Sequence, residues 1–436
     1  MSGVVSTYDS INSFVASLEN RDGAYPYLLN KQWTPGDQIF YSGPFWDHQE
    51  IVAAFESLVT SKWLSAGDSV TKFEKRFSSR FGFNNSVMVN SGSSANLVMI
   101  AALREFYGWD NESEIIVSVC GFPTTLNPVL QNNLKPVLVD INFDDLNWSI
   151  EQIEQSITQN TKAMFCSPVL GNPGNYKRVL DLAKSYNILL ISDNCDSLGS
   201  KWKGRYLTDY SVAASCSFYP AHHLCTVEGG MVSSQESQII AIARSFAWWG
   251  RDCYCEGAQN MLPNGVCGKR FDRWLQGYDE DIDHKYVFSR QGYNLKPLDL
   301  QGAIGAVQLA KAETIHHHRR LNKQKIQLIF ERIPGCRVVN EHEDAEVSWF
   351  GVPIVYSQKR MLVAYLESKK IQTRNYFAGN LLRHPAYKGL SDPALFPNAD
   401  RVLDEVFFLG CSPVITQPMI DYIDEVVSEF ILTTNL

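Results

Sequence analysis

The chain has 436 residues, of which 45% are hydrophobic and 20% are charged, and its formal net charge is −8. Such a chain can bury a large core, and its acidic balance without a long basic run argues against nucleic-acid phosphates as its main source of affinity. No apolar run reaches the length of a membrane span, and residues 1–14 lack a signal-peptide pattern, so we expect a cytosolic protein.

The order of apolar patterns predicts an N-terminal arm followed by two domains. Prolines interrupt residues 1–45, which we interpret as an arm with a short helix. Residues 46–312 predict a large domain that begins with two helices around the turn at 63–67, because apolar residues recur there at helical spacing. Residues 313–436 predict a smaller α+β domain.

Short apolar runs alternate with helical patterns through the large domain. The candidate strands are 86–90, 114–120, 135–141, 162–170 and 188–194. Residues 176–186 are typical of the helices between them. This alternation predicts βαβ units and a mostly parallel sheet covered on both faces, so the expected fold class is α/β. Ligands bind at the carboxyl ends of the strands in such sheets.

The turn after the first strand, residues 90–96, reads NSGSSAN. Backbone N–H groups at a helix start, with serine hydroxyls nearby, form an anion site, so Gly92, Ser93 and Ser94 are candidate phosphate ligands. A serine that caps an ordinary helix is the alternative that this string alone favours.

Residues 216–232 read CSFYPAHHLCTVEGGMV: an apolar run ends in SFYP, two histidines follow, and the chain turns at EGG. This segment resembles the cofactor-lysine segment of the DegT/DnrJ/EryC1/StrS family of sugar-nucleotide aminotransferases, in which a lysine holds pyridoxal phosphate as a Schiff base. His222 stands where that lysine would stand. The resemblance implies the fold-type I architecture, with a seven-stranded-type sheet in the large domain and a small α+β C-terminal domain.

The resemblance also implies roles for residues that occur in family order. Asp193 would pair with the pyridine nitrogen of the cofactor, Phe122 would stack on its ring, and Ser217 would reach its phosphate. Asn294 would reach the phosphate of the neighbouring subunit, which implies a homodimer. In isolation, an aspartate that caps a strand end is the simpler interpretation of Asp193.

Loss of the lysine changes the expected chemistry. Without an amine on the protein, the cofactor is held noncovalently, most naturally as pyridoxamine phosphate. Imidazole is a good general base near neutral pH, so His222 is the candidate that takes a proton from the C4′ methylene of the cofactor after its amine condenses with a keto sugar. Loss of a β-hydroxyl then follows, which makes the reaction a dehydration.

For the other polar side chains near this segment, the sequence indicates a catalytic role less strongly. Tyr219 and Asp196 are candidates to orient the substrate or to stabilise charge on the cofactor, and simple packing or loop polarity is an equal alternative. His223 points elsewhere on the backbone, so we expect no catalytic role for it. His316–His318 predict a solvated helix end rather than a metal site, because three consecutive helix residues spread over different faces.

Four of the ten cysteines could supply the four thiolates that a [2Fe–2S] cluster requires. Between Cys195 and Cys253 lie 57 residues, one residue precedes Cys255, and eleven more precede Cys267. The sequence around them resembles the cluster loop of the CDP-4-keto-6-deoxyglucose 3-dehydrase branch of the family, which implies a [2Fe–2S] cluster on these thiolates. The gap before Cys267 is longer than in that branch, which leaves the fourth ligand open. A tetrathiolate zinc site and unliganded thiols are the alternatives.

These features predict a C3 dehydration and deoxygenation of an NDP-4-keto-6-deoxyhexose, with CDP-4-keto-6-deoxyglucose as the favoured substrate. Electrons would come from a separate NADH-dependent flavin iron–sulfur reductase, and the product would enter 3,6-dideoxyhexose synthesis for an O-antigen. By resemblance, Arg374 and Arg383 help to bind the sugar nucleotide, whose diphosphate suits guanidinium forks, and exposed helix arginines are the alternative.

Three other functions remain open for the whole chain. One is a cluster-free, glutamate-dependent 3-dehydratase of the GDP-4-keto-6-deoxymannose type. Another is a true sugar aminotransferase, which would need a lysine that this site lacks. The third is a non-catalytic relative that binds sugar nucleotides or senses through an iron–sulfur cluster.

Overall fold

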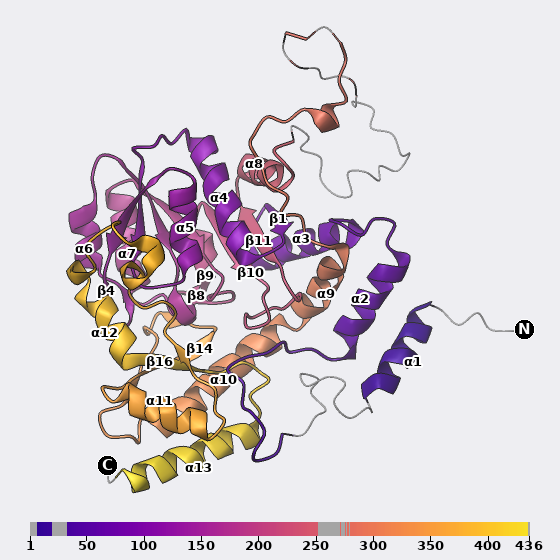
Figure 1. Cartoon of the computed structure of the whole chain (residues 1–436). Coiled ribbons are helices and arrows are strands. Elements are labelled where there is room, and N and C mark those ends of the chain that lie inside the picture. Colours follow the sequence, from indigo (N-terminus) through magenta and orange to yellow (C-terminus); the bar gives the residue numbers. More distant parts are fainter. Residues whose placement is uncertain are drawn as a thin grey trace, which may run out of the picture.

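Three helices precede the first strand of the main sheet: α1 (Thr7–Glu19), α2 (His48–Thr60) and α3 (Asp68–Phe81) (Figure 1). The computed structural model describes residues 7–19, 33–251, 271, 275, 277, 278 and 280–434. α2 begins in a capping box, in which the N–H of Asp47 donates to Oε2 of Glu50, and the Asp47 side chain also accepts a hydrogen bond from the N–H of Gln49. The turn at 63–67 lies between α2 and α3, so the prediction of two helices in this region is confirmed.

The main sheet has seven strands, in the order β1 (Asn85–Val89), β11 (Gly230–Ser234), β10 (Ala213–Ser217), β7 (Leu189–Asp193), β6 (Thr161–Cys166), β2 (Glu114–Ser118) and β3 (Lys135–Val139). The pairs from β10 through β3 are all parallel, whereas β11 runs antiparallel to both of its neighbours. The predicted α/β fold with a mostly parallel sheet is therefore confirmed. The antiparallel strand begins at the second glycine of EGG.

Both faces of this sheet are buried. On one face, Ile115 and Val117 of β2 share a core with α4 (Gly92–Tyr107), α5 (Pro123–Gln131) and α8 (Ser237–Ala247). On the other face, Ile116 packs with α6 (Ile150–Ser156) and α7 (Tyr176–Ser185). Successive side chains of a strand point to opposite faces, so burial on both faces requires the continuous apolar runs that marked these strands in the sequence.

The C-terminal part forms a smaller α+β domain, as predicted. After α9 (Asp299–Ala310), α10 (Ala312–Phe330) leads toward a four-stranded antiparallel sheet. Its strands are, in order, β12 (Arg337–Val338), β14 (Gly351–Val355), β16 (Val406–Gly410) and β15 (Arg374–Asn375). The accompanying helices are α11 (Lys359–Ser368), α12 (Pro397–Glu405) and α13 (Gln417–Thr433), and Figure 1 shows α11 and α13 on the far side of α10 from the main sheet.

The remaining strands are two residues long: β4 (Ile141–Asn142) pairs with β5 (Asn147–Trp148), and β8 (Lys201–Trp202) pairs with β9 (Arg205–Tyr206) and β13 (Ala345–Glu346). Single 3-10 turns lie at 169–171, 207–210, 284–286, 381–383, 385–387 and 393–395. Among the helices that the structure describes, none is both long and apolar enough to cross a membrane.

The prediction that all three consecutive histidines are solvated is wrong for His316. We expected His316–His318 to form a solvated helix end, but α10 continues through them and His316 is buried. Its Nδ1 lies 2.6 Å from the hydroxyl oxygen of Ser348. His317 and His318 are exposed. Successive helix residues are rotated by about 100°, so one of three consecutive side chains can face inward while its neighbours face water.

A buried ion pair anchors β1, the strand that leads into the glycine-serine turn. Nη2 of Arg244 on α8 lies 2.9 Å from Oε2 of Glu74 on α3, and both side chains are more than nine-tenths buried. The other carboxylate oxygen of Glu74 accepts a hydrogen bond of 2.8 Å from the N–H of Met88. One carboxylate therefore ties two helices to β1.

Replacing Arg244 with Met is expected to lower the free energy of unfolding by about 3–5 kcal/mol, because the Glu74 carboxylate would stay buried without its cation. Urea denaturation followed by circular dichroism measures this change. Lys177→Met is the matched control, since Lys177 pairs with Asp181 on the exposed side of α7, and we expect it to change stability by less than about 1 kcal/mol. Equal losses in the two variants would contradict the anchoring role of the buried pair.

Candidate active site

A pocket of about 340 Å³ lies at the carboxyl ends of β6, β7 and β10, where the main sheet meets the small domain. The predicted site residues that line it are Gly92, Ser93, Phe122, Asp193, Cys195, Asp196, Ser217, Tyr219 and His222. They come from separate segments of the chain. A parallel sheet brings the ends of its strands to one edge, which explains why these segments converge.

The turn at the N-terminus of α4 has the geometry of an anion cradle. Ser91, Gly92 and Ser93 line the pocket, and Ser91 also caps the helix by accepting a hydrogen bond of 3.1 Å from the N–H of Ser94. A Cβ atom on Gly92 would lie 2.5 Å from Cβ of Ser217 and 2.8 Å from its Oγ, so the Ser217 hydroxyl sits against the helix start. Ser91 thus belongs both to the cap and to the pocket wall. Ser94 belongs to the cap and does not line the pocket.

The carboxylate of Asp193, at the end of β7, is buried and held by several donors. Its Oδ2 accepts hydrogen bonds from the side-chain amide of Asn96 at 2.8 Å and from the hydroxyl of Thr125 at 2.7 Å. Its Oδ1 accepts from the N–H of Cys195 at 3.3 Å and from the hydroxyl of Ser215 at 3.4 Å. These contacts fix the orientation of a carboxylate that can pair with a protonated pyridine nitrogen. Sequence reasoning missed Asn96 and Thr125, although both lie in the motifs NSGSSAN and GFPTT.

His222 forms part of the pocket wall, with its imidazole largely buried. Burial and the charge of Arg319 lower the pKa of His222 to about 3. Burial and the charge of Asp193 raise the pKa of Asp196 to about 8. Nδ1 of His222 is 3.6 Å from Oδ1 of Asp196, and burial favours the neutral form of both side chains. The neutral imidazole has a lone pair that can accept a proton, but its lowered pKa makes it a weaker base than the ordinary imidazole that the sequence predicts.

The neighbours of His222 in the sequence point in different directions. The rings of Tyr219 and His222 have centroids 6.4 Å apart, and the Tyr219 carbonyl accepts a hydrogen bond of 2.9 Å from the N–H of His222. His223 is buried behind the pocket, where its Nε2 lies 2.8 Å from the carbonyl oxygen of Ser348. The structure therefore places Tyr219 next to His222 and turns the His223 ring away from the pocket, which are the positions that we expected.

Sequence reasoning missed about half of the pocket wall. The missed lining residues are Tyr41, Ser91, Thr124, Ser167, Ala221, Glu228, Phe350 and Phe377. Phe350 packs against His222, with 5.1 Å between ring centroids. Phe377 makes a T-shaped contact with Phe122 at 6.0 Å, and its backbone φ of 45° lies in the left-handed region that a phenylalanine rarely adopts. The small domain thus supplies an aromatic wall that no local motif indicates.

Three more of the predicted binding residues lie outside this pocket. Arg374 stacks over the ring of Tyr41, with 4.3 Å between Cζ and the ring centroid. Tyr41 lines the pocket, so Arg374 contacts a lining residue without lining the pocket itself. Arg383 donates two hydrogen bonds to the carboxylate of Asp400 and is held by that ion pair. Asn294 does not line the pocket of its own chain, and its role in a neighbouring subunit stays a prediction.

Cys195 is the predicted cluster ligand that the structure describes. It lines the pocket, with Sγ 4.0 Å from the hydroxyl oxygen of Ser215, and burial raises its pKa. Cys253, Cys255 and Cys267 lie outside the described residues. Within the described part of the chain, no group of three or more His, Cys, Asp or Glu side chains is placed to hold a metal ion. The cluster therefore stays a prediction.

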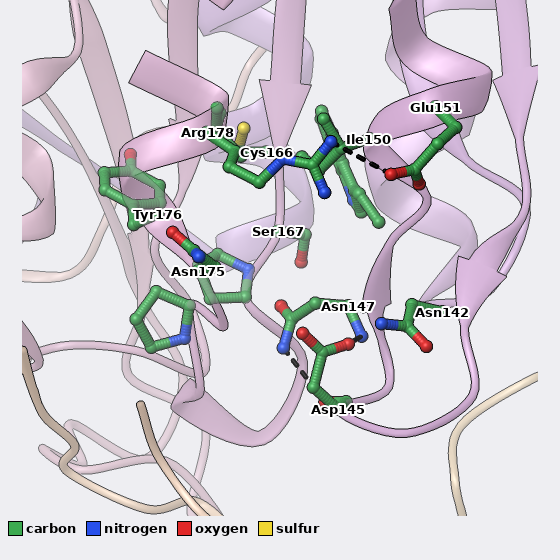
Figure 2. Close-up of a pocket in the computed structure, with 14 residues that line it drawn as sticks. Asn142, Asp145, Asn147, Ile150, Glu151, Cys166, Ser167, Asn175, Tyr176 and Arg178 are labelled. Atoms are coloured by element: carbon green, nitrogen blue, oxygen red, sulfur yellow. Dashed lines mark hydrogen bonds and ion pairs between the residues drawn. The ribbon is translucent and has the colours of Figure 1, made fainter. Parts of the chain in front are cut away.

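Figure 2 shows a second pocket, of about 310 Å³, between the N-terminal ends of α6 and α7 and the β4–β5 hairpin. An ion pair of 2.9 Å between Arg178 and Glu151 crosses it, and Asn147 is hydrogen-bonded to Asp145. None of the predicted site residues lines this pocket, and Ser167 is the lining residue that it shares with the first. The first pocket is therefore the candidate active site.

Known proteins resemble this chain over most of its length. The sequence pattern of the DegT/DnrJ/EryC1/StrS aminotransferase family matches residues 46–428. The dTDP-4-dehydro-2,6-dideoxy-D-glucose 3-dehydratase of Saccharopolyspora spinosa is 37% identical over 408 residues, which cover 90% of this chain and 87% of that protein. The lipopolysaccharide biosynthesis protein RfbH of Salmonella typhimurium is 36% identical over 384 residues, or 84% and 86% of the two chains. The solved structure of E. coli GDP-4-keto-6-deoxy-D-mannose-3-dehydratase with bound hydrated PLP matches with a TM-score of 0.78 at 28% identity, covering 90% and 100%.

Gly92→Ala is expected to weaken the binding of pyridoxamine phosphate by about tenfold or more, because the added Cβ would collide with Ser217 at the cradle. Isothermal titration calorimetry measures the affinity. Gly108→Ala, at the other end of α4, is the control: nothing lies within 4 Å of its added Cβ, although its φ of 65° strains the backbone. We expect the control to lower stability and to keep its affinity. Wild-type affinity in Gly92→Ala would remove this turn from the cofactor site.

Proposed function

The chain is an enzyme that belongs to the DegT/DnrJ/EryC1/StrS aminotransferase family, and from this premise we propose that it removes the C3 hydroxyl of an NDP-4-keto-6-deoxyhexose with pyridoxamine phosphate as cofactor. The observation that carries the proposal is the imidazole of His222 in the pocket wall, at the position where the sequence resemblance puts the family's lysine. Among the described residues that line the pocket there is no lysine, and so no amine for a covalent link to the cofactor.

The residues of the pocket suit pyridoxamine phosphate. The turn at Gly92 and the hydroxyl of Ser217 can bind a phosphate through backbone N–H groups and an O–H group. Asp193 can hold the proton of the ring nitrogen, because its carboxylate is already fixed by four donors. Phe122 is 51% exposed and can stack on a ring. When bound, the cofactor supplies an amine that condenses with a ketone and a ring that delocalises negative charge.

The side chains of the pocket then have separate tasks. His222 accepts a proton from the C4′ carbon of the cofactor. Tyr219 and Asp196 lie beside this base and can orient the sugar by hydrogen bonds to its hydroxyls. Phe350 and Phe377 limit the access of water on the small-domain side of the pocket.

The proposal extends to a [2Fe–2S] cluster on Cys195, Cys253, Cys255 and Cys267. The spacing of these cysteines and the position of Cys195 in the pocket support it. Such a cluster supplies one-electron transfer, and a separate NADH-dependent flavin iron–sulfur reductase is the proposed source of electrons for the 3-deoxy product. A homodimer, in which Asn294 completes the phosphate site of the partner, belongs to the same proposal.

The favoured substrate is CDP-4-keto-6-deoxyglucose, for a 3,6-dideoxyhexose of a lipopolysaccharide O-antigen. The name of the RfbH relative supports this pathway, while the Saccharopolyspora relative is named for a dTDP-linked sugar. A cluster-free, glutamate-dependent GDP-4-keto-6-deoxymannose dehydratase is the second candidate, favoured by the similarity to the solved E. coli enzyme of that type.

His222→Asn is expected to slow dehydration by about 10²–10⁴-fold, because the general base is lost, while the affinity for pyridoxamine phosphate stays unchanged. Loss of the C3 hydroxyl, followed by NMR of the sugar nucleotide, measures the rate. His223→Asn is the control, since the same change falls one residue away on a ring that bonds to the Ser348 carbonyl. Equal losses in the two variants would contradict the assignment of the base.

Protein purified without oxygen is expected to be brown and to contain about two irons and two sulfides per chain. Metal and sulfide analysis with an absorption spectrum tests this, and Cys253→Ser should lose both. A colourless protein, or one that contains zinc alone, would contradict the cluster. Dehydration that then depends on glutamate would favour the second candidate.

A further inference from the structure

Arg319 is a buried cation that donates four hydrogen bonds to main-chain carbonyls and also contacts the thiol of Cys411. Its Nη1 donates to the carbonyls of Trp349 and Phe350 at 3.2 and 3.1 Å, and its Nη2 donates to those of Ala221 and His222 at 3.2 and 3.0 Å. The residue is 1% exposed. Burial of a charge is costly unless hydrogen bonds compensate it, so four carbonyls gathered at one guanidinium indicate a specific task.

This guanidinium lies where the two domains meet. Arg319 is midway along α10, whose first residue Ala312 belongs to the core around α3, while its last residue Phe330 belongs to the core of the small sheet. Of the two segments that it holds, 221–222 follows β10 of the large domain and 349–350 leads into β14 of the small domain. The four hydrogen bonds therefore join the domains directly behind the base.

Both segments also form the wall of the active site. Ala221, His222 and Phe350 line the pocket, and the rings of His222 and Phe350 pack at 5.1 Å with an interplanar angle of 52°. Cζ of Arg319 is 6.0 Å from the centroid of the Phe350 ring, and Arg319 itself does not line the pocket. Arg319 thus reaches the reacting region through the backbone of the proposed base and of its aromatic neighbour.

We propose that Arg319 is a positioning residue for the dehydration, because its carbonyl contacts on both sides of the domain boundary hold the His222 imidazole and the Phe350 ring in one arrangement that faces the pocket. The proposal rests on the proposed function in that His222 is taken as the base. A displacement of about 1 Å can reduce a rate by about 10²-fold, so these contacts affect catalysis from outside the pocket.

Three variants separate this role from general packing. Arg319→Gln removes the charge and the planar guanidinium, whereas Arg319→Lys keeps the charge but lacks the planar set of N–H donors. Arg320→Gln is the matched control, because Arg320 is the next residue on α10 and pairs with Glu346 at the surface. Thermal unfolding of each variant reports its overall stability.

Hydrogen–deuterium exchange of the protein loaded with pyridoxamine phosphate tests the positioning without any substrate. The N–H of His222 donates to the Tyr219 carbonyl, and the N–H of Phe350 donates to the Leu170 carbonyl across the domain boundary. We expect peptides that contain these two N–H groups to exchange faster in both Arg319 variants, and as in the wild type in the Arg320 control. Unchanged exchange at both segments would overturn the proposal.

Steady-state kinetics then connect positioning to catalysis. We expect kcat to fall by about 10²-fold in Arg319→Gln, with KM and the affinity for pyridoxamine phosphate near their wild-type values and part of kcat restored in Arg319→Lys. Parallel losses of kcat and binding, or similar losses in the Arg320 control, would overturn it. Where Arg319→Gln does not fold, Arg319→Lys supplies both measurements. If the wild type does not dehydrate the sugar, the proposed function fails while the exchange result still tests the positioning.

Discussion

The close approach of the turn at 91–92 to the ends of β10 and β11 is the contact on which the rest of the site depends. A Cβ atom on Gly230 would lie 2.1 Å from the carbonyl oxygen of Ser91, and one on Gly92 would collide with Ser217. These two glycines allow β11 to run antiparallel between β1 and β10 while the start of α4 rests against the end of β10. The N-terminus of α4, the Asp193 carboxylate and the loop that carries His222 therefore face one pocket.

Much of this arrangement could be predicted because short stretches of sequence encode it. The strands are continuous apolar runs since both of their faces are buried, and the turn that follows each strand falls at the same edge of a parallel sheet. Residues as far apart in the sequence as Gly92 and His222 could thus be assigned to one site. That His223 points away from His222 could be expected because the two are adjacent on the backbone, whereas Tyr219 was a candidate through the resemblance alone.

The residues that were missed owe their positions to contacts between distant parts of the chain. Phe350 and Phe377 reach the pocket from loops of the small domain, where a lone aromatic residue has no local signature. Arg319 and His316 lie in a run of histidines and arginines that is typical of an exposed helix face. They are buried because α10 passes from one domain core to the other and is enclosed on more than one side there.

The lack of a lysine among the pocket-lining residues that the structure describes also matters for how the cofactor is supplied. A cofactor that is held only by hydrogen bonds and stacking exchanges with the free pool, so the fraction of active molecules follows its free concentration relative to Kd. The same binding stabilises the folded state by mass action, by about 2.7 kcal/mol when the free concentration is about 100 times Kd. The free cofactor concentration would thus set both the number of active molecules and their resistance to unfolding and proteolysis. A covalent link would make both quantities depend much less on that concentration.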